Sequence, residues 1–292
     1  MTARSSGTSG LVAAMLLLSS GCVHTGGQGD FARFAEAAGK VHAQADLSFA
    51  RANAISRRTA VDAFVASRRP GISERAFPPA LDADAVAAWD AALSDLERYG
   101  SLVATLLDGG RGGHAAEAVA GLGRELQTGA AGAKIDPGVG AGFAALAGIL
   151  VDASARSSAR TIMRAADPAV RSTVNAMAGA IGRDRSEGLQ GTVWSNWTTS
   201  LGGIRDQYAA AAEKGDEVRQ RALAIDFLAG VDEREADLRG LASLRASLLA
   251  LADAHAAAVA GSPRAQSAVI DGIDRRLSAV RSNLDLLGGA GR

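Results

Sequence analysis

The sequence contains very little cysteine, few aromatic residues and no excess of either charge. Cys22 is the single cysteine among 292 residues, so no internal disulfide can form. Aromatic residues make up only 4% of the chain, and Lys plus Arg equal Asp plus Glu at 31 each. Neither charge forms a long block, whereas nucleic-acid binding normally requires a concentrated basic patch. The apolar runs at 11–18 and 138–151 are both shorter than the roughly 20 residues that span a bilayer.

The densest basic spots are three arginine pairs, Arg57–Arg58, Arg68–Arg69 and Arg275–Arg276. Acidic residues lie close to two of these pairs in the sequence. We therefore expect the three pairs to lie on solvated helix faces rather than to form a nucleic-acid site.

The first residues have the organisation of a secretory signal. Arg4 supplies a positive charge, residues 11–18 form a short apolar run, and the small residues Ser19, Ser20 and Gly21 precede Cys22. A positive region, an apolar segment and a small-residue cleavage site are the three parts of an exported protein's signal. The pattern predicts that residues 1–21 are removed.

The residues before Cys22 resemble the lipobox of bacterial lipoproteins. Gly21 and Ser20 match the small residues favoured there, while Ser19 stands where an aliphatic residue is usual and Leu18 comes one place earlier. The resemblance implies that Cys22 is lipidated and becomes the first residue of the mature protein. The resemblance covers only the signal. In Gram-negative lipoproteins an Asp directly after the cysteine tends to retain the protein in the inner membrane, so Val23 at this position implies the outer membrane if the source is Gram-negative. An alternative is an ordinary signal peptide that leaves Cys22 as an incidental thiol.

The mature chain is predicted to be an all-α, elongated antiparallel helical bundle with Ala-rich, coiled-coil-like packing. Nearly half of the residues are apolar, and no long stretch alternates apolar and polar residues as a half-buried strand would. Residues 22–29 form a Gly-rich tether, and residues 30–292 form the bundle domain. The expected helices cover 30–67, 82–107, 114–127, 142–165, 187–213, 216–260 and 263–287, and a further helix starts at Asp167. The stretch 216–260 is expected to be one long helix or two abutting ones.

Three helix starts are indicated by a capping side chain directly before a proline. These are Asp136–Pro137, Asp167–Pro168 and Ser262–Pro263. An Asp or Ser oxygen accepts a first-turn N–H, and proline at the first helical position loses no hydrogen bond. All six prolines are therefore expected at helix boundaries or in the loop at 69–80.

Apolar residues at spacings of three and four predict which faces are buried. The expected buried residues are Val86, Trp89, Leu93, Leu96, Gly100, Val103 and Leu107; Val170, Val174, Met177 and Ile181; Trp194, Trp197, Leu201, Ile204 and Tyr208; Leu238, Leu241, Leu244, Leu248, Leu251, His255 and Val259; and Ile270, Ile273, Leu277, Val280, Leu284 and Leu287.

No catalytic, cofactor or metal site is predicted from the sequence. Of the four histidines, His24 lies in the tether, and His255 is expected to be a hydrogen-bonded core residue because it falls on an apolar stripe. The acidic cluster at 232–237 is interpreted as solvated ion pairs, with a divalent-cation site as the alternative. The glycines at 138–142 are interpreted as a flexible lead into a helix, although phosphates also bind before helices.

These observations favour a non-enzymatic, lipid-anchored scaffold or protein-binding bundle of the cell envelope. Its expected partners are the membrane, through acylated Cys22, and an envelope protein or a second copy, because apolar helix faces suit helix-to-helix contacts. One alternative is a membrane-active, pore-forming-like protein that inserts residues 138–151. The other is an enzyme or small-ligand carrier with a hidden site, which a buried polar cleft lined by perturbed carboxylates or by His42, His114 or His255 would indicate.

Overall fold

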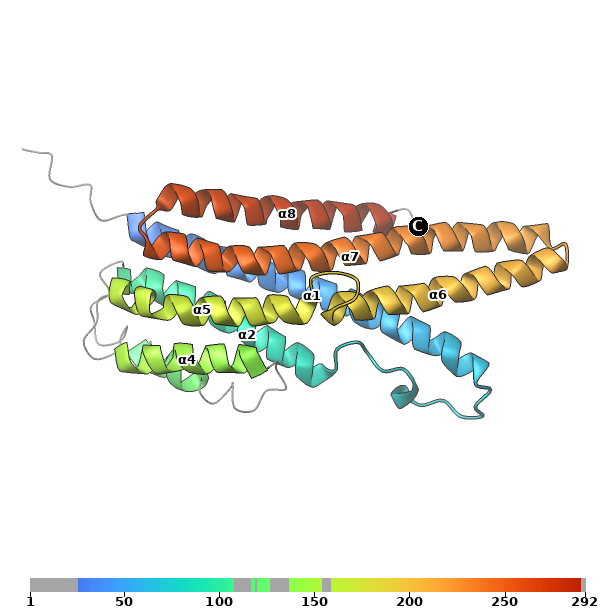
Figure 1. The fold of residues 1–292 in the computed structure, drawn as a ribbon, viewed down its shortest axis with the longest axis horizontal. Helices are drawn as coiled ribbons and strands as arrows, with labels where there is room; N and C mark the ends of the chain where they lie inside the picture. Colours follow the sequence, from blue (N-terminus) through green and yellow to red (C-terminus); the bar gives the residue numbers. More distant parts are fainter. Residues whose placement is uncertain (1–25, 108–116, 119, 127–136, 154–158, 290–292) are drawn as a thin grey trace, which may run out of the picture.

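The computed structural model describes residues 26–107, 117–118, 120–126, 137–153 and 159–289 (Figure 1). All regular elements among these residues are helical and pack together, which confirms the all-α bundle. The labelled elements are α1 (Gly26–Ala66), a 3-10 turn (Glu74–Ala76), α2 (Ala83–Leu107), α4 (Pro137–Ala153), α5 (Ala159–Ile181), α6 (Gly188–Glu213), α7 (Glu217–Val259) and α8 (Pro263–Gly289). Residues 117–118 and 120–126 are also helical. The predicted signal, Cys22, His24 and His114 lie outside the described residues.

Helix α7 is the longest element and runs along the whole bundle. Its 43 residues extend about 65 Å at 1.5 Å per residue. Helices α5 and α6 follow one another end to end along it, and α8 folds back over its C-terminal half (Figure 1). Helix α1 crosses α7 and also contacts α2, α6 and α8. The result is an elongated bundle, as the long 216–260 helix predicted.

One continuous core confirms most of the predicted stripes. All four predicted residues of α5 are buried, and so is every predicted residue of α7 from Leu238 to His255. Val86, Trp89 and Leu107 at the ends of the α2 stripe are half-buried. Tyr208 is the exception, because it lies near the C-terminal end of α6 and is 41% exposed. The side chains of Leu284 and Leu287 lie outside the described residues.

A tight link joins α5 to α6. Gly182 and Gly188 at its two ends have positive φ angles of 91° and 55°. At Gly182 a Cβ would lie 2.0 Å from the carbonyl oxygen of Glu187, so no larger residue fits there. The Gln190 amide donates to the Gly182 carbonyl over 2.7 Å and closes the turn. The link allows α6 to continue in the direction of α5 along α7.

Two predicted helix starts are confirmed, and the third is wrong. Helices α4 and α8 begin at Pro137 and Pro263, as predicted. Pro168, however, lies inside α5. The Asp167 carboxylate does not cap a helix there but accepts a hydrogen bond from His255 on α7. The apolar stripe of α5 continues through the proline, so tertiary packing maintains the helix despite the missing N–H.

The predicted helix at 142–165 was also wrong. Helix α4 ends at Ala153 and α5 begins at Ala159, and the two helices pack against each other as a pair. The glycines at 138–142 lie within α4 rather than in a flexible lead. At Gly142 a Cβ would lie 2.2 Å from the Thr173 hydroxyl, so this glycine allows the close approach of α4 to α5. Helix α1 starts at Gly26, four residues before the predicted start.

Candidate functional site

A chain of three hydrogen-bonded polar side chains crosses the core near one end of the bundle. The Tyr99 hydroxyl on α2 lies 2.9 Å from His255 Nε2, and His255 Nδ1 lies 2.9 Å from an oxygen of Asp167 on α5. Tyr99 and His255 are fully buried, and the rings of Phe31 and Phe34 lie at 5.6 and 5.7 Å from the imidazole. The prediction that His255 is a hydrogen-bonded core residue is confirmed.

The protonation states of Asp167 and Tyr99 determine which atoms donate and which accept in the two hydrogen bonds to His255. The hydrogen bond from His255 is the main cause that lowers the pKa of Asp167, so this carboxylate accepts from the Nδ1–H group. Burial raises the pKa of Tyr99 far above its ordinary value, so its O–H remains protonated and donates to Nε2. This order resembles an acid–base relay, but no solvent reaches Tyr99 or His255. The network therefore fixes α2, α5 and α7 to one another.

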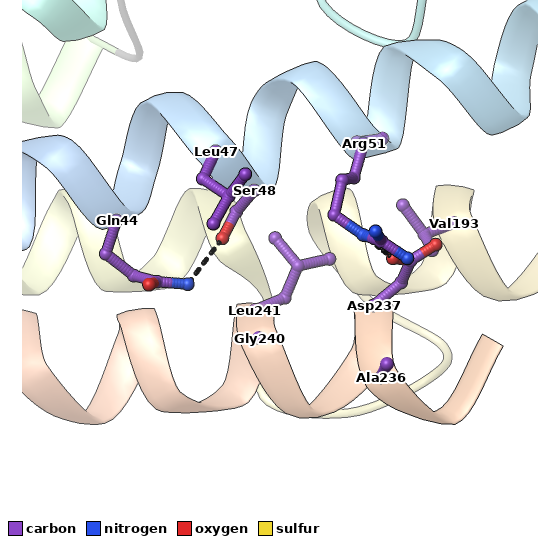
Figure 2. A pocket seen from close by; sticks show the side chains of 10 residues that line it. Gln44, Leu47, Ser48, Arg51, Val193, Ala236, Asp237, Gly240 and Leu241 are labelled. Atoms are coloured by element: carbon purple, nitrogen blue, oxygen red, sulfur yellow. Dashed lines mark hydrogen bonds and ion pairs between the residues drawn. The ribbon is translucent and has the colours of Figure 1, made fainter. Parts of the chain in front are cut away.

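A second polar cluster lies between α1, α6 and α7 (Figure 2). Asp237 is buried and accepts from the Arg51 guanidinium and, over 2.9 Å, from the Trp197 indole N–H. On α1, on the N-terminal side of Arg51, the Gln44 amide donates a hydrogen bond to the Ser48 hydroxyl over 3.2 Å. The space between these side chains is about 10 Å³, which is room for a single water molecule.

Asp237 is therefore a structural residue that the sequence analysis missed. It was placed among the solvated ion pairs of 232–237, yet its carboxylate is buried and paired with a residue 186 positions away. Asp237 on α7 binds Arg51 of α1 and Trp197 of α6, and separating these helices would leave its buried charge without a partner, which is costly. The cluster therefore holds α1, α6 and α7 in register. The neighbouring Arg234 and Glu235 do form a partly exposed ion pair, as expected.

A third polar region is an open hollow between α2 and the side chains or backbone of Ala118, Gly121, Leu122 and Glu125, with a volume of about 510 Å³. The Arg98 guanidinium lies 2.6 Å from Glu125 across it and 3.7 Å from Asp95. Burial raises the pKa of Asp95 to about 6, Arg98 acts to lower it and Glu125 adds to the increase. The hollow holds paired charges of both signs and is wide open to solvent.

The apolar segment at 138–151 lies within α4 against α5 and residues 122–126. Val139, Phe143, Leu146 and Leu150 are buried in the common core. Among the described residues, none of the helices is both long and apolar enough to cross a membrane.

The far end of the α6–α7 hairpin exposes large apolar side chains. This hairpin tip, residues 205–229, projects past the ends of α5 and α8 (Figure 1). Val218, Ile225 and Leu228 of α7 are 83%, 62% and 64% exposed, and Tyr208 of α6 is exposed too. Solvated apolar residues at helical spacing are typical of an interaction surface.

The arginine pairs predicted to be solvated are exposed at all six positions. Arg57–Arg58 and Arg275–Arg276 lie on helix faces as expected, whereas Arg68 and Arg69 follow the end of α1 and are not helical. His42 is half-buried on α1, where its Nε2 lies 2.7 Å from an Asp90 oxygen. His255 instead contacts Tyr99 and Asp167, so the two histidines belong to different polar clusters. Comparison with known protein families, with curated proteins and with solved structures finds no match to the chain.

Proposed function

We propose that this protein is a lipid-anchored, non-enzymatic scaffold of the cell envelope that pairs with a second copy through its hairpin tip. The exposed apolar stripe on α7 is the observation that carries the proposal. Lipid anchoring rests on the lipobox-like residues before Cys22.

The stripe has the spacing of a helix-to-helix seam. Val218, Ala222, Ile225 and Ala229 are separated by four, three and four residues, and all four are exposed. Leu223 and Gly230 occupy the opposite face of α7 and are buried, Gly230 beside Leu201 of α6. The hairpin is therefore held together through one face of α7, and the other face is available to another helix.

The order of residues along the stripe suits pairing with itself. In an antiparallel pair of identical helices centred near 223–224, Val218 lies opposite Ala229, and Ala222 lies opposite Ile225. Each large side chain then meets an alanine, which allows the two helices to approach closely. Arg219 and Asp226 lie on one flank of the stripe, where Arg219 also donates to Gln207 of α6 over 3.1 Å, so in the antiparallel pair each can face its opposite charge in the second copy.

The stripe is short, so pairing of two copies through it would be weak without a membrane anchor. Twelve residues span only about 18 Å, which is short for a stable dimer interface. Two copies anchored in one membrane have a raised effective concentration, so a weak contact becomes populated without additional contacts.

A cysteine crosslinking experiment tests the pairing. The purified full-length protein in vesicles would carry Ala222→Cys, and Val65→Cys serves as a control because Val65 is an exposed apolar residue of α1 (68% exposed). We expect a short thiol crosslinker to give a dimer with Ala222→Cys, to give none with Val65→Cys, and to lose the dimer when Ile225→Asp is added.

The alternatives give different outcomes. Equal crosslinking from Val218→Cys would indicate parallel pairing, and products of a different mass in the host would indicate another protein as partner. Either result, or a dimer that is indifferent to Ile225→Asp, overturns the antiparallel self-pairing. Mass spectrometry of the N-terminus tests the anchor separately: an unmodified N-terminus, or unchanged membrane association of Cys22→Ala, would contradict lipid anchoring.

A further inference from the structure

Three metal-ligating side chains converge where α1 packs on α2, away from the hairpin tip. They are His42 and Asp46 of α1 and Asp90 of α2, whose ligand atoms all lie within 4.8 Å of one another. His42 Nε2 is 2.7 Å from Asp90 Oδ1. Ligands bonded to one metal ion at 2.0–2.2 Å lie about 3 Å apart, so small rotations of these side chains suffice to bind a common ion.

The helical geometry brings the three residues together. His42 and Asp46 are four positions apart on α1, so they lie on one face, one turn apart. Helix α2 runs antiparallel to α1, and the Phe49 and Trp89 rings, 5.1 Å apart, secure its register next to the site. Asp90 follows Trp89 directly and therefore meets His42.

The electrostatics of the cluster favour a cation. Two carboxylates face the same point, and in the described part of the chain neither of them forms an ion pair with Lys or Arg. The nearby Lys40 instead pairs with Glu36 and with Asp274 of α8, at 2.8 and 3.0 Å. Among the residues that the structure describes, the basic group that pairs within the cluster is the His42 imidazole, a side chain that can also bind a metal.

We infer that His42, Asp46 and Asp90 bind one divalent cation of the Zn²⁺ type. One imidazole nitrogen with two carboxylate oxygens is a donor set for borderline metals, because imidazole suits Zn²⁺ while hard cations such as Mg²⁺ prefer oxygen alone. The His42 side chain is only 18% exposed and is held in place, whereas Asp90 is 61% exposed. The outer side of the site therefore remains open to water, which completes the coordination.

The bound ion would connect α1 to α2 by coordinate bonds. Because the two helices are separate stretches of chain, an ion that binds only the folded arrangement stabilises it, by an amount that rises with the logarithm of the ion concentration above Kd. The site is independent of Cys22 and of the hairpin tip, so it can be tested without reference to the proposed scaffold function.

The test uses metal-stripped full-length protein in detergent, with Zn²⁺ as the probe in calorimetry and Co²⁺ as the probe in absorption spectroscopy. We expect one equivalent of Zn²⁺ to bind and to raise Tm, and Co²⁺ to give visible ligand-field bands. His42→Ala and Asp90→Asn should each weaken Zn²⁺ binding at least about tenfold and alter the Co²⁺ spectrum.

Two controls identify the binding site. His114→Ala removes another histidine, and Asp206→Asn removes an exposed carboxylate of α6, so both should bind Zn²⁺ as the wild type does. Circular dichroism shows whether each variant is folded, which separates loss of a ligand from loss of structure. The proposal is overturned if Zn²⁺ does not bind, if both His42→Ala and Asp90→Asn bind it normally, or if His114→Ala is the variant that loses it.

Discussion

Asp95 is predicted to make the protein less stable at neutral pH than in mild acid. Burial raises the pKa of this carboxyl from 3.8 to about 6, with a further contribution from Glu125. The folded protein therefore holds the Asp95 proton more tightly than the unfolded chain does. Its contribution to the free energy of unfolding falls as pH rises from about 4 to about 6 and stays low above that range. A pKa shift of this size lowers the free energy of unfolding by about 3 kcal/mol at pH 7, compared with a carboxyl whose pKa is the same in the folded and unfolded chain.

Asp95→Asn keeps the shape of the side chain and removes the charge that burial disfavours. We expect the variant to be more stable than the wild type by about 2–3 kcal/mol at pH 7 and almost equal to it at pH 4. The substitution removes the 3.7 Å ion pair between Arg98 and Asp95 and leaves the 2.6 Å ion pair between Arg98 and Glu125 intact. The favourable electrostatic energy lost is therefore small compared with the burial cost that is removed.

The assay is urea unfolding followed by circular dichroism at several pH values between 4 and 8. Asp206→Asn on the exposed part of α6 is the matched control and should follow the wild-type curve at every pH. If the advantage of Asp95→Asn is the same at pH 4 and pH 7, or is absent at both, then burial does not destabilise the ionised carboxyl and the reasoning is wrong.

Two further substitutions test the core. Tyr99→Phe removes the O–H donor to His255 and leaves the buried Nε2 without a partner, so it should lower the free energy of unfolding in urea by about 1–3 kcal/mol; an unchanged midpoint would show that the network is not required. Gly142→Val places a side chain where a Cβ already lies 2.2 Å from the Thr173 hydroxyl, so it should lower Tm by several degrees or prevent folding. Gly148→Ala, where a Cβ meets nothing within 4 Å, is the control and should not lower Tm.

The sequence was sufficient to predict the parts of the fold that depend on local chemistry. Helix starts at Pro137 and Pro263 follow from the proline itself, and the burial of His255 follows from its place on an apolar stripe. The same local rule was wrong at Asp167–Pro168, because the carboxylate that could cap a helix is bound instead by a histidine 88 residues away.

The polar clusters could not be predicted in full, since each joins residues from different helices. The spacing of His42 and Asp46 was a usable signal for two of the three proposed metal ligands, but nothing local indicates that Asp90 joins them. Asp237 was assigned to the surface because its neighbours in the chain are charged, whereas its partners Arg51 and Trp197 come from α1 and α6. Only the packing of the helices reveals such sites.

The continuity of α7 has a mechanical consequence. A single unbroken helix leads from the exposed residues near Val218 to the buried imidazole of His255, so both belong to one stiff lever. The helix extends about 56 Å from His255 to Val218, so a tilt of about 5° at the buried end would move the exposed end by roughly 5 Å. Small rearrangements among α2, α5 and α7 would therefore be amplified into displacements nearly as large as a full turn of helix at the point farthest from them.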